Sequence, residues 1–485
     1  MSFLFDIPQE VLDLIGDFLN NRDVARMVLA CRHLHGCFSP LLWKKVTLQV
    51  WPGKQLIPID QLQTRAYCVH TLQIRGPLPL EYYSVVFPRL SVLHLETTAT
   101  TDYSGAEQDY NWACLVRHNP TIQYVDLHCP HVLSRNSSEV WSAISSSLQN
   151  PKRLRLDGLG IDAFSNSVQE LFWKAASKFE EVDYMGFDQL AGGGHNIIDF
   201  SRIKRFAYTS IDMPGRTDYQ LGLFSRCTGL TRLRWSHASS YFPIDDFIRF
   251  LEGKTWPLLD DLALERIAEE DKDVATVIRL VPPLKHLRLQ ARSFGPLCFG
   301  ELGKRHFGTL RSLCLSRCDG LTSRMALEVL NNCSLLEVFE ARCISVVDLA
   351  ELPQPWACHR LKYLGICFNG GHDQPGMDSV VFEQLSRLKQ LEEIDLSLTD
   401  IPHMRRRLEG RVPQWDLNSG GLERLVTLRR LRRVAFGIGQ NLEQEDIEWM
   451  LEHWRLLESL EGILSPYLDI SRRLRAFAAT RGVDC

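Results

Sequence analysis

The sequence lacks the features that place a chain in a membrane or on a nucleic acid. It has no run of about 18 uninterrupted apolar residues, the length that a membrane-spanning helix needs. Neither sign of charge dominates, because 55 Lys and Arg residues are balanced by 59 Asp and Glu residues, for a net charge of −4. Nucleic-acid-binding proteins usually carry a basic excess. We therefore expect no membrane and no nucleic acid among the partners of this chain.

The common catalytic and metal-binding motifs are also missing. No Gly-x-Ser-x-Gly or His-Glu-x-x-His sequence occurs, and the glycine run at 192–194 is not followed by the Lys-Ser/Thr of a phosphate-binding loop. Cys314 and Cys318 have no second Cys or His pair at zinc spacing nearby, which favours core packing over a zinc site. We expect a chain that is not an enzyme by itself, with no metal and no cofactor.

The first six residues contain no basic segment followed by an apolar one, so we expect no signal peptide. The 14 cysteines are scattered along the chain. Without a signal peptide they are expected to be reduced thiols, because disulfides form in oxidising compartments. These observations predict a cytoplasmic or nuclear protein.

Leucine is abundant, with 72 copies among 485 residues, and it recurs in the pattern apolar-x-x-apolar-x-apolar. From Phe179 to Leu361 successive copies are 24 to 29 residues apart. Clear copies begin at Leu90, Leu230, Leu259, Leu284, Leu310, Leu361 and Leu391, weaker ones at Val69, Ile122, Phe179, Ile203, Leu336 and Leu431, and partial ones at Leu154 and Leu457. This signature and period are those of a leucine-rich repeat.

The spacing has a physical cause, because alternate residues of a strand lie on the same face and a buried face must be apolar. The remainder of each repeat often has helical spacing, as in residues 168–176. The predicted fold is therefore α/β: a leucine-rich repeat solenoid, or horseshoe, with parallel strands inside and helices outside. We expect about 14 to 15 repeats over residues 69–465, a linker or N-terminal cap at 49–68, and a C-terminal capping helix at 466–485.

One stretch resembles the cysteine-containing subtype of intracellular leucine-rich repeats. It reads Leu310-x-x-Leu313-x-Leu315-x-x-Cys318, followed by Asn332-Cys333-x-x-Leu336. In that subtype the cysteines are small buried residues at the corners of the solenoid. The resemblance implies this place for Cys227, Cys318 and Cys333.

Residues 1–48 do not share the repeat. They have apolar residues at helical spacing in about three short segments, which predicts a three-helix module. Gly16 interrupts the first helix at a cost of up to ~1 kcal/mol relative to alanine. The order Ile7-Pro8-x-Glu10-Val11-Leu12-x-x-Ile15, then Asp23-Val24-x-x-Met27-Val28-x-x-Cys31-Arg32-x-Leu34 and Pro40-Leu41-Leu42-Trp43 resembles an F-box, with Ile7 in place of the usual leucine.

The chain is thus similar to F-box proteins with C-terminal leucine-rich repeats, and the resemblance implies partners. An F-box binds a Skp-type adaptor, which is held by a cullin and a RING protein in an SCF ubiquitin ligase. About half of the matching apolar positions are expected to contact the adaptor, the others forming the core of the module. These positions are Ile7, Pro8, Val11, Leu12, Ile15, Leu19, Val24, Met27, Val28, Leu34, Leu42 and Trp43.

Two groups of residues are candidates for binding a protein substrate. The segment between Leu396 and Leu422 contains Arg405, Arg406, Arg407, Arg411 and Trp415. Such a group could hold an acidic or phosphorylated peptide, because arginine pairs bidentately with phosphate, although a solvated basic surface is the favoured interpretation. Polar residues between the apolar strand positions, namely Arg155, Arg234 and Arg288, are equally compatible with substrate contacts and with inert surface.

These observations lead to two hypotheses. The first is a non-catalytic substrate receptor of an SCF-type ligase, in which the repeats bind an unknown protein for ubiquitination and proteasomal degradation. The alternative is a leucine-rich repeat scaffold that binds proteins without a ligase role, its N-terminal helices serving only as a cap.

Overall fold

In the computed structural model, the chain divides into two compact units, residues 1–230 with 237–240, and residues 231–236 with 241–485. The described residues are 7–50, 55–97, 105–128, 138–158, 166–186, 198–210, 217–237, 243–253, 256–267, 270–352, 354–370, 378–397, 413–418, 421–437 and 440–484. No helix within these ranges combines the length and the apolar character that crossing a membrane would require.

The first unit contains a three-helix module followed by parallel strands, each paired with its neighbours in sequence. The strands are β1 (Lys45–Gln49), β2 (Thr71–Arg75), β3 (Val92–Glu96), β4 (Tyr124–His128), β5 (Arg153–Asp157), β6 (Glu181–Gly186) and β7 (Arg205–Ser210). The helices are α1 (Gln9–Phe18), α2 (Asn21–Ala30), α3 (Arg32–Leu42), α4 (Ile59–Arg65), the 3-10 helix η1 (Ala66–Cys68), α5 (Leu80–Tyr83), α6 (Gly105–His118), α7 (Ser138–Ser147), α8 (Asn166–Ala176) and α9 (Thr217–Ser225).

The second unit repeats this arrangement with strands that are again parallel and in sequence order. They are β8 (Arg232–His237), β9 (Asp261–Ile267), β10 (His286–Ala291), β11 (Ser312–Cys314), β12 (Val338–Ser345), β13 (Tyr363–Asn369), β14 (Glu393–Asp395), β15 (Arg433–Phe436) and β16 (Ser459–Gly462). The helices are α10 (Ile244–Glu252), α11 (Asp271–Leu280), α12 (Pro296–Arg305), α13 (Ser323–Asn332), α14 (Val346–Glu351), α15 (Asp378–Ser386), α16 (Gly421–Arg424), the 3-10 helix η4 (Leu425–Thr427), α17 (Gln444–His453) and α18 (Leu468–Thr480).

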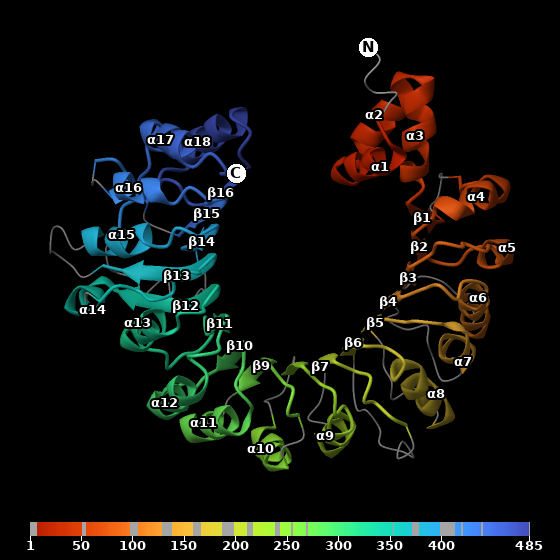
Figure 1. The fold of residues 1–485 in the computed structure, drawn as a ribbon, viewed down its shortest axis with the longest axis horizontal. Helices are drawn as coiled ribbons and strands as arrows, with labels where there is room; N and C mark the ends of the chain where they lie inside the picture. Colours follow the sequence, from red (N-terminus) through yellow and green to blue (C-terminus); the bar gives the residue numbers. More distant parts are fainter. Residues whose placement is uncertain are drawn as a thin grey trace. The chain divides into compact units, whose positions relative to one another are not determined.

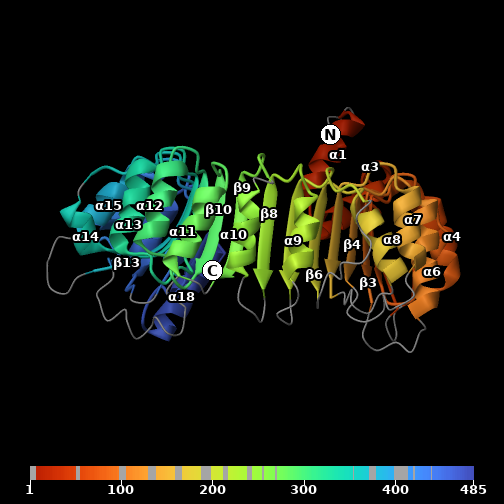
Figure 2. The ribbon, with the colours of Figure 1, turned by 90° about the horizontal axis from the view of Figure 1, so that it is seen from below.

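Within each unit the strands lie along one side and the helices along the other (Figure 1). In the first unit α6, α7 and α8 lie next to one another behind the strands, as both views show (Figures 1 and 2). The prediction of an α/β leucine-rich repeat solenoid with parallel strands and helices on the opposite side is confirmed.

The repeat pattern places its apolar residues between these two layers. In β4, Val125 and Leu127 are buried, whereas Tyr124 and His128 project from the opposite face and are exposed. Every predicted copy of the pattern from Val69 to Leu457 coincides with one of the strands β2 to β16. The sheet begins earlier than the expected solenoid start at residue 69, because β1 supplies a strand with only two buried positions.

Backbone hydrogen bonds join each strand to the preceding one at a recurring point. The N–H groups of His70 and Thr71 both donate to the Lys44 carbonyl, at 3.0 and 2.9 Å. The corresponding pair at the start of β4 donates to Ser91 O, at 2.9 Å each. The same arrangement precedes most strands of both units, so each repeat starts on the backbone of its predecessor.

The predicted corner cysteines are buried. The N–H of Leu230 donates to Cys227 O at 3.1 Å, and the N–H of Leu336 donates to Cys333 O at 3.2 Å, which makes a tight turn just before the strand. Cys318 is also buried and its thiol lies 3.3 Å from Leu289 O. Burial raises the pKa of each of these three thiols to about 12. They pack as small apolar residues, as the resemblance implied.

Polar side chains connect one repeat to the next behind the sheet. Asp271 in α11 accepts hydrogen bonds from the N–H groups of Gly295 (2.7 Å), Leu297 (2.9 Å) and Cys298 (3.0 Å) at the start of α12. The buried Asp109 in α6 accepts from Glu139 and Val140 at the start of α7. The free N–H groups of a helix start are thus satisfied by the preceding helix instead of a local cap.

The predicted C-terminal helix is present as α18. After it, Asp484 forms a parallel bridge with Ser459, and its N–H donates to Glu458 O at 2.8 Å. This short segment lies against β16 and occupies hydrogen-bonding groups of the last strand, which would otherwise be an open edge.

Candidate functional site

The N-terminal module is built around a very small core. Leu12 in α1, Val24 in α2, and Leu34 and Phe38 in α3 are its buried hydrophobic side chains. The start of α2 is fixed by Asn20, whose side-chain oxygen accepts from the N–H of Asp23 at 3.0 Å. The three-helix organisation predicted from the sequence is therefore present.

The predicted adaptor contacts fall into three groups by burial. Leu12, Val24 and Leu34 form the core and are not available to a partner. Ile7, Leu19, Met27, Val28 and Leu42 are partly buried against this core, and Trp43 is half-buried. Pro8, Val11 and Ile15 are exposed. The matching apolar positions thus divide between core and surface, as expected. Their contact with an adaptor stays a prediction.

Helix α1 carries a second, outward-facing apolar surface, of which the sequence analysis singled out Val11 and Ile15 but not Leu14 and Phe18. Leu14 is 59% exposed and Phe18 is 91% exposed. With Val11 and Ile15 they follow the spacing i, i+3, i+4, i+7, which places all four on one side of the helix. We call Val11, Leu14, Ile15 and Phe18 the α1 stripe. A further large apolar side chain, Leu29 in α2, is also exposed.

Gly16 explains how α1 sits in the module. A Cβ atom at this position would lie 2.0 Å from Leu41 Cδ1 and 3.3 Å from Leu41 Cγ. The missing side chain therefore lets α1 approach α3 closely. Gly16 lies on the core side of α1 with Leu12, which leaves the α1 stripe on the side directed away from α3.

The basic segment proposed as a substrate contact lies only partly within the described residues. Arg405, Arg406, Arg407 and Arg411 lie outside the described residues. Trp415 is described and corrects the expectation, because it is 1% exposed and its ring packs edge-on against Phe382 and Phe436. Its side chain is part of the core and is not available at the surface.

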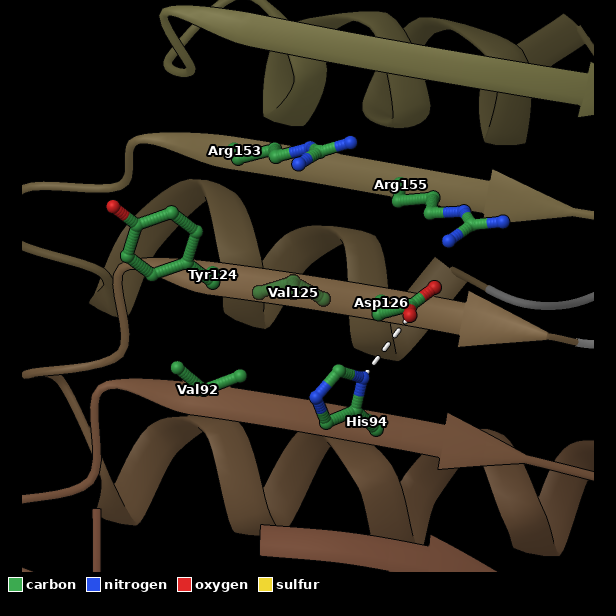
Figure 3. Close-up of a pocket in the computed structure, with 7 residues that line it drawn as sticks. All are labelled: Val92, His94, Tyr124, Val125, Asp126, Arg153 and Arg155. Carbon is green, nitrogen blue, oxygen red and sulfur yellow. Dashed lines mark hydrogen bonds and ion pairs between the residues drawn. The ribbon is translucent and has the colours of Figure 1, made fainter. Parts of the chain in front are cut away.

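The strand-face arginines include one that lines a hollow. Arg155 projects from β5 into a depression of about 260 Å³ on the open face of β3, β4 and β5 (Figure 3). The full lining comprises Val92, His94, Tyr124, Val125, Asp126, Arg153 and Arg155. In the second unit, Arg234 is exposed on β8 and Arg288 lies 4.0 Å from Glu340 on its open face.

The acidic side chains around this hollow are engaged by neighbouring residues. The oxygen–nitrogen distances are 2.9 Å for Glu96 with Arg75, 3.0 Å for Asp126 with His94, 3.1 Å for Asp157 with His128, 3.5 Å for Asp183 with Arg153, and 2.7 Å for Glu181 with Arg205. Arg155 makes no ion pair or hydrogen bond with any residue that the structure describes. Its guanidinium group therefore has no anionic partner among the described residues, unlike that of Arg153.

Within the described part of the chain, no group of three or more His, Cys, Asp or Glu side chains is placed to hold a metal ion. Cys314 donates to a carboxylate oxygen of Glu340, and burial is the main cause that raises its pKa to about 11.

No protein-family model and no curated protein matches this chain. Solved structures of similar fold include the yeast Rad7 and Elc1 complex, with 13% identity, a TM-score of 0.42, and coverage of 80% of this chain and 78% of that chain. An internalin from Listeria monocytogenes has 13% identity, a TM-score of 0.32, and coverage of 82% and 88%. The TLR13–ssRNA13 complex has 11% identity, a TM-score of 0.37, and coverage of 86% and 58%.

Proposed function

We propose that this chain is the substrate-recognition subunit of an SCF-type ubiquitin ligase. The N-terminal module binds a Skp-type adaptor, and through it a cullin and a RING protein. The repeats bind a protein substrate and bring it to the ligase. In this role the chain makes and breaks no covalent bond; it raises the local concentration of the substrate near the ubiquitin-carrying enzyme.

The observation that carries the proposal is the α1 stripe. Phe18 and Leu14 are large apolar side chains that the small module core leaves in contact with water. Burying such a side chain at an interface contributes about 1.5–3 kcal/mol, and clustered exposed apolar residues commonly mark a protein-binding surface. A cap that served only the solenoid would direct its apolar residues towards the first repeat.

The module and the repeats also divide the work in the way a receptor needs. The α1 stripe belongs to a helix that packs on α3. The open strand face that includes Tyr124 and Arg155 therefore remains available to a second partner at the same time. A protein with two separate binding surfaces can join two other proteins without chemistry of its own.

The test measures the affinity of the full-length chain for a purified Skp-type adaptor. Leu14→Glu is expected to weaken binding by about 30-fold or more, because it removes a buried apolar contact and places a charge in its position. Leu297→Glu is the matched control, since Leu297 lies on helix α12 and has the same 59% exposure as Leu14. This control should bind the adaptor like the unmodified chain.

Both variants should unfold at the temperature of the unmodified chain, because the replaced side chains are exposed. Unmodified protein that fails to bind the adaptor would overturn the proposal. A second outcome would indicate a scaffold without a ligase role. In that case the unmodified chain binds the adaptor and captures a partner protein, but cells degrade that partner equally fast whether they contain the unmodified chain or the Leu14→Glu variant.

A further inference from the structure

The hollow on β3, β4 and β5 is assembled by strand register. Val92, Tyr124 and Arg153 are direct partners across the three strands, and so are His94, Asp126 and Arg155. Figure 3 shows these two rows projecting from the same face, with the carboxylate of Asp126 turned to the His94 ring. Residues more than 60 positions apart in sequence thus form one surface.

The hydrogen-bonding groups of this surface leave one basic side chain without a partner among the described residues, the guanidinium of Arg155. Asp126 is held by His94 at 3.0 Å, and Asp183, next to the hollow on β6, is held by Arg153 at 3.5 Å. Arg155 has no such partner among the described residues and is exposed. A guanidinium on a partly enclosed surface, with its nearby carboxylates already engaged, is a site for an added anion.

The other lining residues suit an anion that is attached to a polypeptide. Tyr124 is exposed beside Val92 at the end of the hollow opposite to His94 and Asp126. An aromatic ring and an aliphatic side chain can cover the apolar atoms that neighbour a charged group in an extended peptide. A free inorganic ion would make no use of this half of the hollow.

We propose that this hollow binds an anionic side chain, a carboxylate or a phosphate, of the protein that the repeats recognise. Arg155 donates two hydrogen bonds to the anion, and Tyr124 with Val92 contacts the neighbouring apolar residue. The proposal extends the proposed function by naming the chemistry of the substrate. Its test contains no adaptor, so it can fail or succeed independently of adaptor binding.

The experiment titrates the full-length chain calorimetrically with three acetylated peptides of sequence Gly-Leu-Xaa-Leu-Gly, where Xaa is glutamate, phosphoserine or glutamine. At least one anionic peptide is expected to bind about 10-fold or more tightly than the glutamine peptide, because hydrogen bonds to charged groups are strong. Tighter binding of phosphoserine identifies phosphate as the preferred group, and similar binding of glutamate shows that a carboxylate suffices.

Two arginine variants locate the site. Arg155→Gln should remove the preference for anionic peptides without changing the melting temperature. Arg234→Gln is the control, because Arg234 occupies the same strand position on β8, is exposed, and has no partner among the described residues. It should retain the preference. Equal binding of all three peptides, no binding at millimolar concentration, or a preference that survives Arg155→Gln would overturn the proposal.

Discussion

The N-terminal module and the repeats of the first unit differ in how completely they bury their apolar and polar side chains. The module buries few apolar side chains and leaves Leu14 and Phe18 exposed. The repeats bury even large residues such as Trp112 and Trp141 completely. Stacked repeats hide their apolar surface from water, whereas the module leaves part of its own exposed, as a surface that binds a partner does.

Polar burial differs in the same direction. Among the described residues of the module, Ser39 is the one buried polar side chain. The repeats bury amide, carboxyl and imidazole groups, and these bond to the backbone of a neighbouring repeat. Asn119, for example, accepts from the N–H of Phe87 at 2.6 Å. The module therefore depends on apolar packing, whereas the repeats also depend on specific polar contacts.

The largest expected effect breaks the core of the module. Phe38→Ala should cost about 3–5 kcal/mol locally, which exceeds what a unit of this size can lose. Limited proteolysis should then cleave within the first 44 residues and adaptor binding should be lost, while the main melting transition of the repeats stays in place. If this segment remained protease-resistant, the repeats rather than its own core would be holding the module together.

A smaller effect distinguishes close packing from open surface at two glycines of the module. Gly16→Ala should destabilise it by about 1–3 kcal/mol, because the added methyl group collides with Leu41. Gly36→Ala should stabilise it by about 0.5–1 kcal/mol, since nothing lies within 4 Å of the new atom and alanine suits a helix better.

Both changes in the stability of the module can be measured by urea denaturation, with the resistance of the module to proteolysis as the signal at each urea concentration. Gly300→Ala in α12 is the comparison within the repeats, and it also has no atom within 4 Å. It should resemble Gly36→Ala. Equal effects of Gly16→Ala and Gly36→Ala would mean that α1 does not pack on α3 at this distance.

The last expected effect concerns pH and belongs to the repeats alone. His306 is buried, its Nδ1 accepts from the N–H of Leu284 at 3.1 Å, and its Nε2 donates to Ile278 O at 3.0 Å. Burial lowers the pKa of His306 below its ordinary value of 6.5. The unfolded chain therefore binds a proton that the folded chain resists, and stability is lost as the pH falls below about 6.5.

The free energy of unfolding measured between pH 5 and 8 should change by at most about 1.4 kcal/mol per pH unit from this site, the slope for one proton. His306→Asn should reduce the slope, because an amide does not take up a proton in this pH range. The variant should keep the fold, since an amide oxygen can accept the same N–H, as Asn119 does in another repeat. An unchanged slope in His306→Asn would contradict the expectation.

The repeats were predictable because burial imposes a period on the sequence that does not depend on distant contacts. Strand β1 was missed since Val46 and Leu48 form only a partial copy next to the module. Leu14 and Phe18 of the α1 stripe were missed for a different reason. Helix α1 has apolar residues on two faces, and only the packing on α3 decides which face stays exposed.

Sites that depend on contacts between residues far apart in the sequence were predicted less well. Trp415 close to several arginines suggested a binding surface, but its neighbours in space are Phe382 and Phe436. Arg155 was one of three equivalent arginines in the sequence. Only the pairing of β3, β4, β5 and β6 shows that the carboxylates of Asp126 and Asp183 beside it already have partners.

The backbone ladder between successive strands has a consequence for synthesis of the protein. Each strand accepts its first hydrogen bonds from the next strand of the sequence, as Lys44 O does from Thr71 and Ser91 O from Tyr124. When a repeat leaves the ribosome, the strand on which it pairs has therefore already been synthesised. No strand within a unit depends on a strand that is translated much later. Such a chain can grow its sheet from the amino-terminal side as translation proceeds, with little time for unpaired edges to meet other chains.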